Sequence, residues 1–342
     1  MVRVRLKDVA AAAGVSPATV SLVLNEASER ITPKTIARVK AAADELGYVP
    51  NTAARSLKTR RTQTIGVVTD TVLTTGSAAA MVQGAQEIAW QHDHLLFWLG
   101  TENKPALVER AVQALSARQV DGFLFAAMYH RVLDFGSLTR GVPTVGLDAV
   151  STDPQVPCFV PDDFAAARVA VHLLIEQGHR RIAHISEPVG DGVARQLRLD
   201  GYRAALADAG LGEGQVVVPQ WIHLGSRSAE IAAMGLLDSP DRPTAVFAFN
   251  DIAAMGVYHA ARRLELAIPH DLSVVGFDDY ENVASELYPA LTTMSLPHRT
   301  MGRLAATALL ARLGVVDEPV PSGATRVECP PVIRDSVGPP QG

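Results

Sequence analysis

The sequence L-K-D-V-A-A-A-A-G-V-S-P-A-T-V-S-L-V-L-N at residues 6–25 contains two short helical patterns joined at Gly14. Glycine supplies the backbone freedom that a sharp turn between two helices requires. Ser16 is a favourable N-cap, and Pro17 suits the first helical position, where no N–H group is needed. The second pattern has one apolar face, made by Val20, Val23 and Leu24. The stretch therefore predicts a helix-turn-helix, whose second helix enters the major groove of DNA.

Charge is distributed unevenly along the chain, whose net charge is −5. Residues 1–61 hold 11 Lys or Arg and 5 Asp or Glu, a net of +6. Residues 62–342 hold 20 basic and 31 acidic residues, a net of −11. A small basic head on an acidic body favours binding of a polyanion through the head alone. The basic segment coincides with the helix-turn-helix, which makes a chance fluctuation in charge the poorer explanation.

Length and composition limit the class of protein. The 342 residues are too many for one compact core and predict two or three domains. No apolar run has membrane-spanning length, and the basic N-terminus lacks the apolar core of a secretory signal. The two cysteines, Cys158 and Cys329, are far apart and have no Cys or His at metal-ligand spacing. We expect a reduced, cytoplasmic protein with no structural metal and no membrane contact.

A third helix and a short basic segment follow the first two helices. Thr32 and Pro33 form a helix start, and Gly47 ends the helical pattern. Pro50 then disfavours helix at the residue before it. Residues 51–58 have the pattern of one more helix, too short to be stable alone in water.

These segments carry a resemblance to a known family. The motifs D-V-A-x-x-A-G-V-S-x-A-T-V-S-x-V-L-N at 8–25, L-G-Y-V-P-N at 46–51 and A-R-S-L at 54–57 resemble the LacI/GalR family of bacterial repressors. The resemblance implies that Leu57 matches a leucine that wedges into the minor groove at the centre of the operator. An apolar wedge of this kind unstacks one base step and bends the duplex. The alternative for Leu57 is an ordinary packing leucine between domains.

The resemblance also implies a helix-turn-helix domain at 1–50 and, at 51–62, a hinge helix and linker that fold on operator DNA. The expected DNA interface comprises Leu6, Ser16, Pro17, Ala18, Thr19, Ser21, Leu22, Asn25, Thr32, Thr35, Tyr48, Asn51, Ala54, Arg55 and Leu57. Three of these, Pro17, Ala18 and Leu22, are small or apolar and favour contact with thymine methyl groups over bidentate readout of guanine. Specificity is then expected to depend on the polar members of the set, on the hinge and on DNA bending.

From Thr64 onward, strand patterns alternate with helical patterns, which predicts an α/β core with parallel sheets. Strands are expected at 64–70, 95–99, 120–126, 142–148, 181–185, 216–219, 245–251 and 273–278. Helices are expected at 78–91, 106–118, 164–177, 196–209 and 252–266. Two consecutive series of similar size indicate two similar lobes with a cleft between them.

The family resemblance extends over this core, through motifs such as F-N-D-x-A-A-x-G and S-V-V-G-F-D-D. It implies a two-lobed, periplasmic-binding-protein-like core at 63–342 that binds an effector and dimerises. The first lobe is expected at about 63–161 plus 293–318, and the second at about 162–292 plus 319–342.

Ligands of open α/β sheets bind beyond the carboxyl ends of the strands, and that rule selects candidate effector-binding residues. Carboxylates, amides and arginine bind sugar hydroxyl groups, and aromatic rings pack against the sugar's C–H face. The expected set is Thr75, Tyr129, Asp148, Arg198, Trp221, Asn250, Asp278 and His298, of which Arg198 matches the family arginine that grips the effector. The alternative interpretation of Asn250 is a helix cap, and the alternative interpretation of Arg198 is a surface ion-pair partner. Trp221 and His298 have the simpler explanation of structural residues.

An enzyme is disfavoured by the absence of catalytic motifs. No G-x-G-x-x-G follows a strand, and no Walker-type loop, G-x-S-x-G elbow or HExxH pattern occurs. The adjacent acids Asp162 and Asp163 are expected to point in opposite directions on a strand, which is poor geometry for a carboxylate pair. We expect no catalytic residue and no cofactor.

The sequence thus predicts a cytoplasmic, nucleoid-associated transcriptional repressor that binds a pseudo-palindromic operator as a homodimer or a tetramer. The resemblance implies a small-molecule effector in the cleft, most often a carbohydrate, with purines and other metabolites as minority cases. Binding of effector and of DNA is reciprocally coupled, and the sign, induction or corepression, stays open. A stand-alone sugar receptor would leave the basic head without a role.

Overall fold

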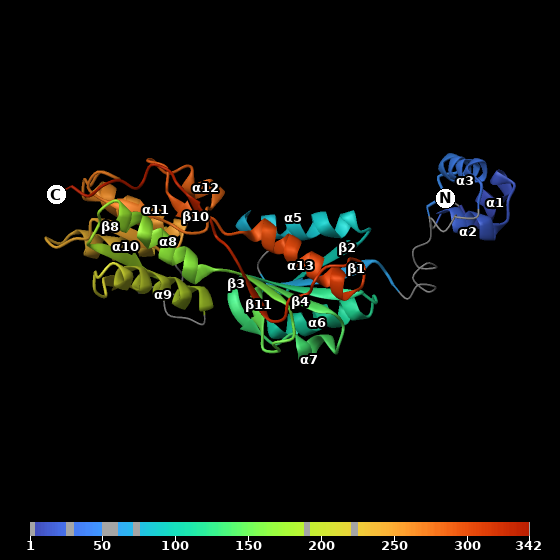
Figure 1. The fold of residues 1–342 in the computed structure, drawn as a ribbon, viewed down its shortest axis with the longest axis horizontal. Coiled ribbons are helices and arrows are strands. Elements are labelled where there is room, and N and C mark those ends of the chain that lie inside the picture. The colour runs from blue at the N-terminus through green and yellow to red at the C-terminus, as the bar shows by residue number, and fades with distance from the viewer. Residues whose placement is uncertain are drawn as a thin grey trace. The chain divides into compact units, whose positions relative to one another are not determined.

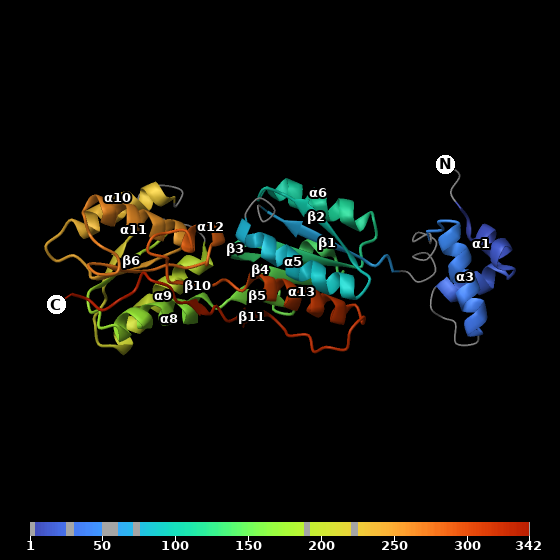
Figure 2. The same cartoon turned by 90° about the horizontal axis from the view of Figure 1, so that it is seen from above.

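A computed structural model describes residues 4–24, 31–49, 61–70, 76–187, 192–219 and 225–341, except for the side chains of residues 76–78 and 129 (Figures 1 and 2). The chain divides into two compact units, residues 1–62 (the head) and residues 63–342 (the core). The expected hinge helix at 51–58 lies outside the described residues.

Three helices form the head: α1 (Leu6–Ala13), α2 (Pro17–Leu24) and α3 (Pro33–Glu45). Gly14 ends α1 in the left-handed region with φ +59°, as a turn of this kind requires. The Thr32 side chain caps α3 by accepting a hydrogen bond from the Thr35 backbone N–H. One fully buried valine from each helix meets in the centre, namely Val9, Val20 and Val39. The predicted helix-turn-helix with a closing third helix is therefore confirmed.

Among the described residues, no single helix is long and apolar enough to cross a bilayer. Helices α1 and α2 reach that length and hydropathy only when taken together, across a bend of 102°.

The first lobe of the core is a six-stranded, wholly parallel sheet with the order β11-β5-β4-β3-β1-β2. Its strands are β1 (Thr64–Thr69), β2 (Leu95–Gly100), β3 (Gly122–Leu133), β4 (Thr144–Ser151), β5 (Cys158–Pro161) and β11 (Ala324–Val327). Its helices are α5 (Gly76–Gln91), α6 (Pro105–Ser116), α7 (Gly136–Thr139) and α13 (His298–Arg312). Helices α5 and α13 bury one face of the sheet, and α6 and α7 bury the other (Figure 1).

The second lobe is a four-stranded parallel sheet with the order β7-β6-β8-β9. Its strands are β6 (Ile182–Ile185), β7 (Gln215–Val217), β8 (Ala245–Ala248) and β9 (Ser273–Val275). Helices α8 (Asp163–Glu176) and α9 (Val193–Asp208) pack on one face, and α10 (Ser226–Leu237) and α11 (Asp251–Arg263) on the other. The short helix α12 (Glu281–Ala284) and the antiparallel pair β10 (Thr293–Met294) and β12 (Pro331–Val332) complete the core.

The predicted strands and helices of both lobes are present, with three differences that concern function. The strand expected at 273–278 ends at Val275, so Asp278 lies in the loop after it. The strand expected at 245–251 ends at Ala248, because Asn250 caps α11 by accepting from the Ala253 N–H. The chain also stays in the first lobe longer than expected, because β11 pairs with β5 after residue 319. The chain therefore re-enters the second lobe only after Val327.

Helices α5 and α13 approach each other closely at two glycines. A Cβ on Gly302 would overlap the backbone carbonyl oxygen of Met81, and one on Gly84 would overlap that of Arg299. Helix backbones that come this close tolerate no side chain at the crossing point. This contact joins the α13 segment, which is far away in sequence, to the first lobe.

We predict that Gly302→Ala lowers the free energy of unfolding of the core by about 1–3 kcal/mol, because the helices must separate to admit the methyl group. Gly235→Ala is the matched control, since Gly235 lies within α10 and a Cβ there meets nothing within 4 Å. Gly235→Ala should be neutral or stabilise by up to about 1 kcal/mol through helix propensity. Urea denaturation of both variants tests the pair, and equal stability of the two would contradict the close crossing.

Candidate functional site

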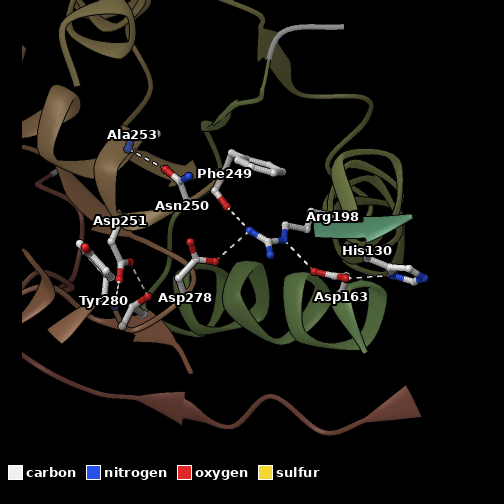
Figure 3. Close-up of polar contacts among 10 residues, drawn as sticks. His130, Asp163, Arg198, Phe249, Asn250, Asp251, Ala253, Asp278 and Tyr280 are labelled. Atoms are coloured by element: carbon white, nitrogen blue, oxygen red, sulfur yellow. Dashed lines mark hydrogen bonds and ion pairs between the residues drawn. The ribbon is translucent and has the colours of Figure 1, made fainter. Parts of the chain in front are cut away.

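Arg198 is the centre of a buried polar cluster in the core (Figure 3). Its Nε donates to Asp163 Oδ1 at 2.8 Å, and its Nη1 donates to the Phe249 carbonyl oxygen at 2.6 Å and to Asp278 Oδ1 at 3.3 Å. The side chain is only 5% exposed. Burial would lower the pKa of Arg198, but the charges of Asp163 and Asp278 raise it above the usual value. The guanidinium therefore stays charged and is held in one orientation.

Two aromatic rings flank the same guanidinium. Its Cζ atom lies 3.6 Å from the ring centroid of Phe277 and 4.6 Å from that of Phe249. Both rings are buried, so the cation–π contacts form away from solvent, where they are strongest. The interpretation of Arg198 as a surface ion-pair partner is therefore wrong.

Asp163 is an anionic partner of Arg198, and sequence reasoning missed this role. The adjacent Asp162 caps α8 by accepting from the Ala165 N–H, and Asp163 opens the helix with its side chain fully buried. The expectation that these acids alternate on a strand is wrong, because β5 ends at Pro161. Burial alone would raise the pKa of Asp163, but the Arg198 charge and hydrogen bonding hold it below the usual value.

An irregularity in the first lobe brings His130 and Asp148 to this cluster. Strands β3 and β4 are in register up to Ala126 and resume at Arg131, so that residues 127–130 of β3 lie opposite Asp148 alone. Asp148 has φ +52°, a left-handed conformation that aspartate tolerates better than most residues. Bulges of this kind redirect side chains, and they occur next to functional sites. His130 Nδ1 lies 3.5 Å from Asp163 Oδ2 as a result.

Asp148 is buried, and one of its two carboxyl oxygens has no hydrogen bond to compensate for the loss of water. Its side chain is 3% exposed, and Oδ1 has no hydrogen-bond partner. Burial and the nearby Asp163 charge raise its pKa well above the usual value, although Arg198 opposes the shift. Asp148 is therefore the candidate for a neutral carboxylic acid that both donates and accepts.

The loop after β9 carries the remaining acids. Burial raises the pKa of Asp278 to about 6 despite the Arg198 charge, and Asp278 is about a quarter exposed. Asp251 accepts hydrogen bonds from the Tyr280 N–H and the Thr293 hydroxyl, both at 2.6 Å (Figure 3). It thus joins the first residue of α11 to the Asp278 loop and to β10, which leads to the first lobe.

The structure brings together some of the predicted effector-binding residues and leaves others aside. Asp148, Arg198 and Asp278 are electrostatically coupled in one cluster. Asn250 is adjacent to it but uses its side-chain oxygen as the α11 cap. His298 is buried at the first position of α13. Thr75, Trp221 and the Tyr129 side chain lie outside the described residues.

The head presents the exposed face of α2. Ser16, Pro17, Ala18 and Leu22 are exposed, whereas Thr19 and Ser21 are half-buried, and Ser16 Oγ accepts from the Thr19 N–H as the N-cap. Leu6 and Tyr48 are partly buried against the head core, and Thr32 and Thr35 bond to each other. Asn25, Asn51, Ala54, Arg55 and Leu57 lie outside the described residues. No group of three or more described His, Cys, Asp and Glu side chains has a metal-binding arrangement.

Comparison with known proteins agrees with both units. Residues 5–51 match the bacterial regulatory proteins of the lacI family, and residues 171–337 match the periplasmic binding protein-like domain. The ribose operon repressor of Escherichia coli strain K12 is 37% identical over 315 residues, which cover 90% of this chain and 92% of the relative. The chain belongs to the LacI family.

Solved structures of LacI-family proteins cover nearly the whole chain. The lac repressor dimer bound to operator and the anti-inducer ONPF is 28% identical, with a TM-score of 0.79 over 98% of this chain and 99% of that one. The complex of the transcriptional regulator CelR with cellobiose is 33% identical, with a TM-score of 0.67 over 98% of this chain and all of that one. The predicted family and fold are confirmed, and the chain is a transcriptional regulator and not an enzyme.

We predict that Asp251→Asn flattens the pH dependence of stability between about pH 4 and pH 8. Burial and the Asp278 charge raise the pKa of Asp251 from its ordinary value of 3.8 to about 8. Between these values the unfolded chain has already lost the proton that the folded protein keeps, so wild-type stability falls as pH rises. Asparagine matches the shape and cannot ionise.

Melting temperatures of wild type and Asp251→Asn across pH 5–8 test this. The melting temperature of the variant should rise by several degrees relative to that of the wild type as the pH increases. Asp241→Asn, at an exposed site, is the control and should follow the wild type. A constant difference between wild type and Asp251→Asn would show that Asp251 does not titrate in this range.

Proposed function

We propose that this LacI-family regulator is a repressor that binds a pseudo-palindromic operator as a homodimer, and that a neutral carbohydrate bound around Arg198 changes its operator affinity. The observation that carries the proposal is the buried cluster itself. Arg198, in α9, and Asp278, in the loop after β9, come from the second lobe, and Asp148, in β4, comes from the first. A ligand held by both lobes stabilises one arrangement of the lobes over others, which is the physical basis of effector control.

DNA recognition is assigned to the exposed face of α2 together with the hinge at 51–62. Leu22 is 45% exposed on that face, which is a large apolar exposure for a domain of this size. Contact with a thymine methyl group accounts for an apolar residue there. The small residues beside it, Pro17 and Ala18, allow the helix to lie deep in the groove. The basic composition of the head supplies the phosphate contacts.

Assembly as a homodimer is assigned to the free edge of the first-lobe sheet. Strand β2 is one of the two edge strands of this sheet, and Leu95 and Phe97 are exposed on it, two residues apart and so on the same face. Trp90, at the end of α5, is 67% exposed. An uncovered sheet edge with large apolar side chains requires a partner or a protective device, and a second copy supplies the partner. In this proposal the protein acts in the cytoplasm, at the nucleoid.

Electrophoretic mobility shift on the DNA upstream of its own gene, with and without a panel of sugars, tests the repressor function. Leu57→Ala should lower operator affinity at least tenfold, because the minor-groove wedge is lost, while sugar affinity stays unchanged. Ile231→Ala, at an exposed apolar residue of α10, is the control and should bind operator as the wild type does. The absence of any shift in the wild type would refute the repressor, and equal binding by Leu57→Ala would refute the wedge.

A charge in the proposed dimer face should separate the subunits. Phe97→Glu is expected to be monomeric in sedimentation-velocity experiments and to lose tight operator binding, because two linked heads bind far better than one. Ile333→Glu introduces the same charge at another exposed apolar residue and should stay dimeric. A dimeric Phe97→Glu protein would place the interface elsewhere.

A further inference from the structure

The segment that follows β12 is bonded closely to the second lobe. Ser336 is fully buried; its hydroxyl donates to the Val274 carbonyl oxygen at 2.6 Å, and its own carbonyl oxygen accepts from the Val274 N–H at 2.9 Å. The Gly338 N–H donates to the Ser273 hydroxyl at 3.0 Å, and its carbonyl oxygen accepts from Nε2 of the buried His179 at 2.8 Å. The segment therefore covers the outer edge of β9, the last strand of its sheet.

Arg334, at the start of this segment, makes three hydrogen bonds. Its backbone N–H donates to the Thr292 hydroxyl at 2.9 Å, its Nη1 to the Leu291 carbonyl oxygen at 2.9 Å and its Nη2 to Asp279 Oδ1 at 2.7 Å. The guanidinium is planar and presents its N–H groups in a rigid fork, so a carbonyl and a carboxylate bonded to it are fixed relative to each other. Arg334 thus ties the Asp279 carboxylate to the 291–292 backbone.

Asp279 directly follows Asp278, the acid that accepts a hydrogen bond from Arg198. Asp278 has φ +107° and Asp279 has φ +52°, so two consecutive non-glycine residues adopt positive φ. Backbone conformations of this kind are unfavourable for residues with a side chain and persist where surrounding contacts hold them. The direction of the Asp278 side chain therefore depends on what holds this loop.

Two backbone hydrogen bonds hold the residues on either side of Asp279. The Asp278 N–H donates to the Met294 carbonyl oxygen at 2.8 Å. The Tyr280 N–H donates to Asp251 Oδ2 at 2.6 Å (Figure 3). The bond from the arginine side chain to Asp279 is a third contact and lies between the other two along the chain.

We propose that Arg334 is a positioning residue for the effector site: by holding Asp279, it keeps the loop in the conformation that directs Asp278 toward Arg198. The proposal rests on the effector site proposed above and adds a determinant from the segment that follows β12. The simpler explanation is a partly exposed ion pair that affects only stability, since the side chains of Arg334 and Asp279 are 21% and 24% exposed.

Asparagine at position 279 separates the two explanations. It keeps an oxygen that accepts from Arg334, tolerates a left-handed backbone and removes the negative charge. Positioning requires the acceptor, whereas an ion pair requires the charge. Asp279→Asn should therefore behave like the wild type, and Asp279→Ala should not.

Hydrogen exchange of peptides covering residues 277–287, measured by mass spectrometry on the free protein, tests the loop without a ligand. Arg334→Ala and Asp279→Ala should each raise the exchange rate at least fivefold, because the loop opens more often. The double variant should exchange no faster than either single variant, since the two residues act through one contact. Asp279→Asn should exchange like the wild type.

Arg263→Ala is the matched control, because it removes another second-lobe ion pair, between the last residue of α11 and Glu230 of α10. It should leave exchange of the 277–287 peptides unchanged. Wild-type exchange in Arg334→Ala would overturn the proposal, and so would equal acceleration in Asp279→Asn and Asp279→Ala.

Isothermal titration calorimetry measures the consequence for the site, with D-ribose, D-glucose and cellobiose as probes. Arg334→Ala and Asp279→Ala should each bind the sugar that the wild type binds at least fivefold more weakly, and the double variant no more weakly than either. Asp279→Asn and Arg263→Ala should stay within twofold of the wild type. Unchanged affinity in Arg334→Ala would overturn the positioning role. If the wild type binds no sugar, the carbohydrate effector fails, and the exchange rates alone decide whether Arg334 holds the loop.

Discussion

The buried charge of Arg198 is the constraint on which the rest of the site depends. Removing a guanidinium from water is costly unless carboxylates and hydrogen bonds compensate, and removing one partner of such a group leaves the other uncompensated. Asp163 and Asp278 supply the charge, the Phe249 carbonyl oxygen supplies a further acceptor, and two aromatic rings enclose the plane. These partners come from α8, from the end of β8 and from the loop after β9. The positions of three segments of the second lobe are therefore tied to one side chain.

The first lobe reaches the same cluster through its backbone. The register shift between β3 and β4 places residues 127–130 opposite Asp148, which takes a left-handed conformation. A regular ladder would have alternated these side chains between the two faces of the sheet. The bulge instead directs His130 and Asp148 toward the second lobe.

Two sets of contacts join this cluster to the first lobe. Asp251, the first residue of α11, accepts one hydrogen bond from Tyr280 in the loop that carries Asp278 and one from Thr293 in β10. One carboxyl group is thus bonded both to the loop of the arginine cluster and to a strand that leads to the first lobe. Helix α13 then follows β10 and packs tightly on α5 through Gly84 and Gly302. These contacts connect the arginine cluster to the helices of the first lobe.

Asp148 and Asp278 were selected as candidate residues from their places at the ends of predicted strands, and Arg198 from its match to a family motif. The helix-turn-helix and the alternation of strands and helices could be predicted from sequence, because they rest on local patterns: a glycine turn, N-caps and periodic apolar residues. Asp163 and His130 could not, since the acid belongs to a helix start mistaken for a strand, and the histidine is placed by a bulge that depends on pairing with a distant strand. The same applies to β11, whose four residues become a strand only beside β5. Sequence determined which groups were available, and tertiary structure decided which of them are buried together, because burial and electrostatic coupling depend on contacts between segments far apart in the chain.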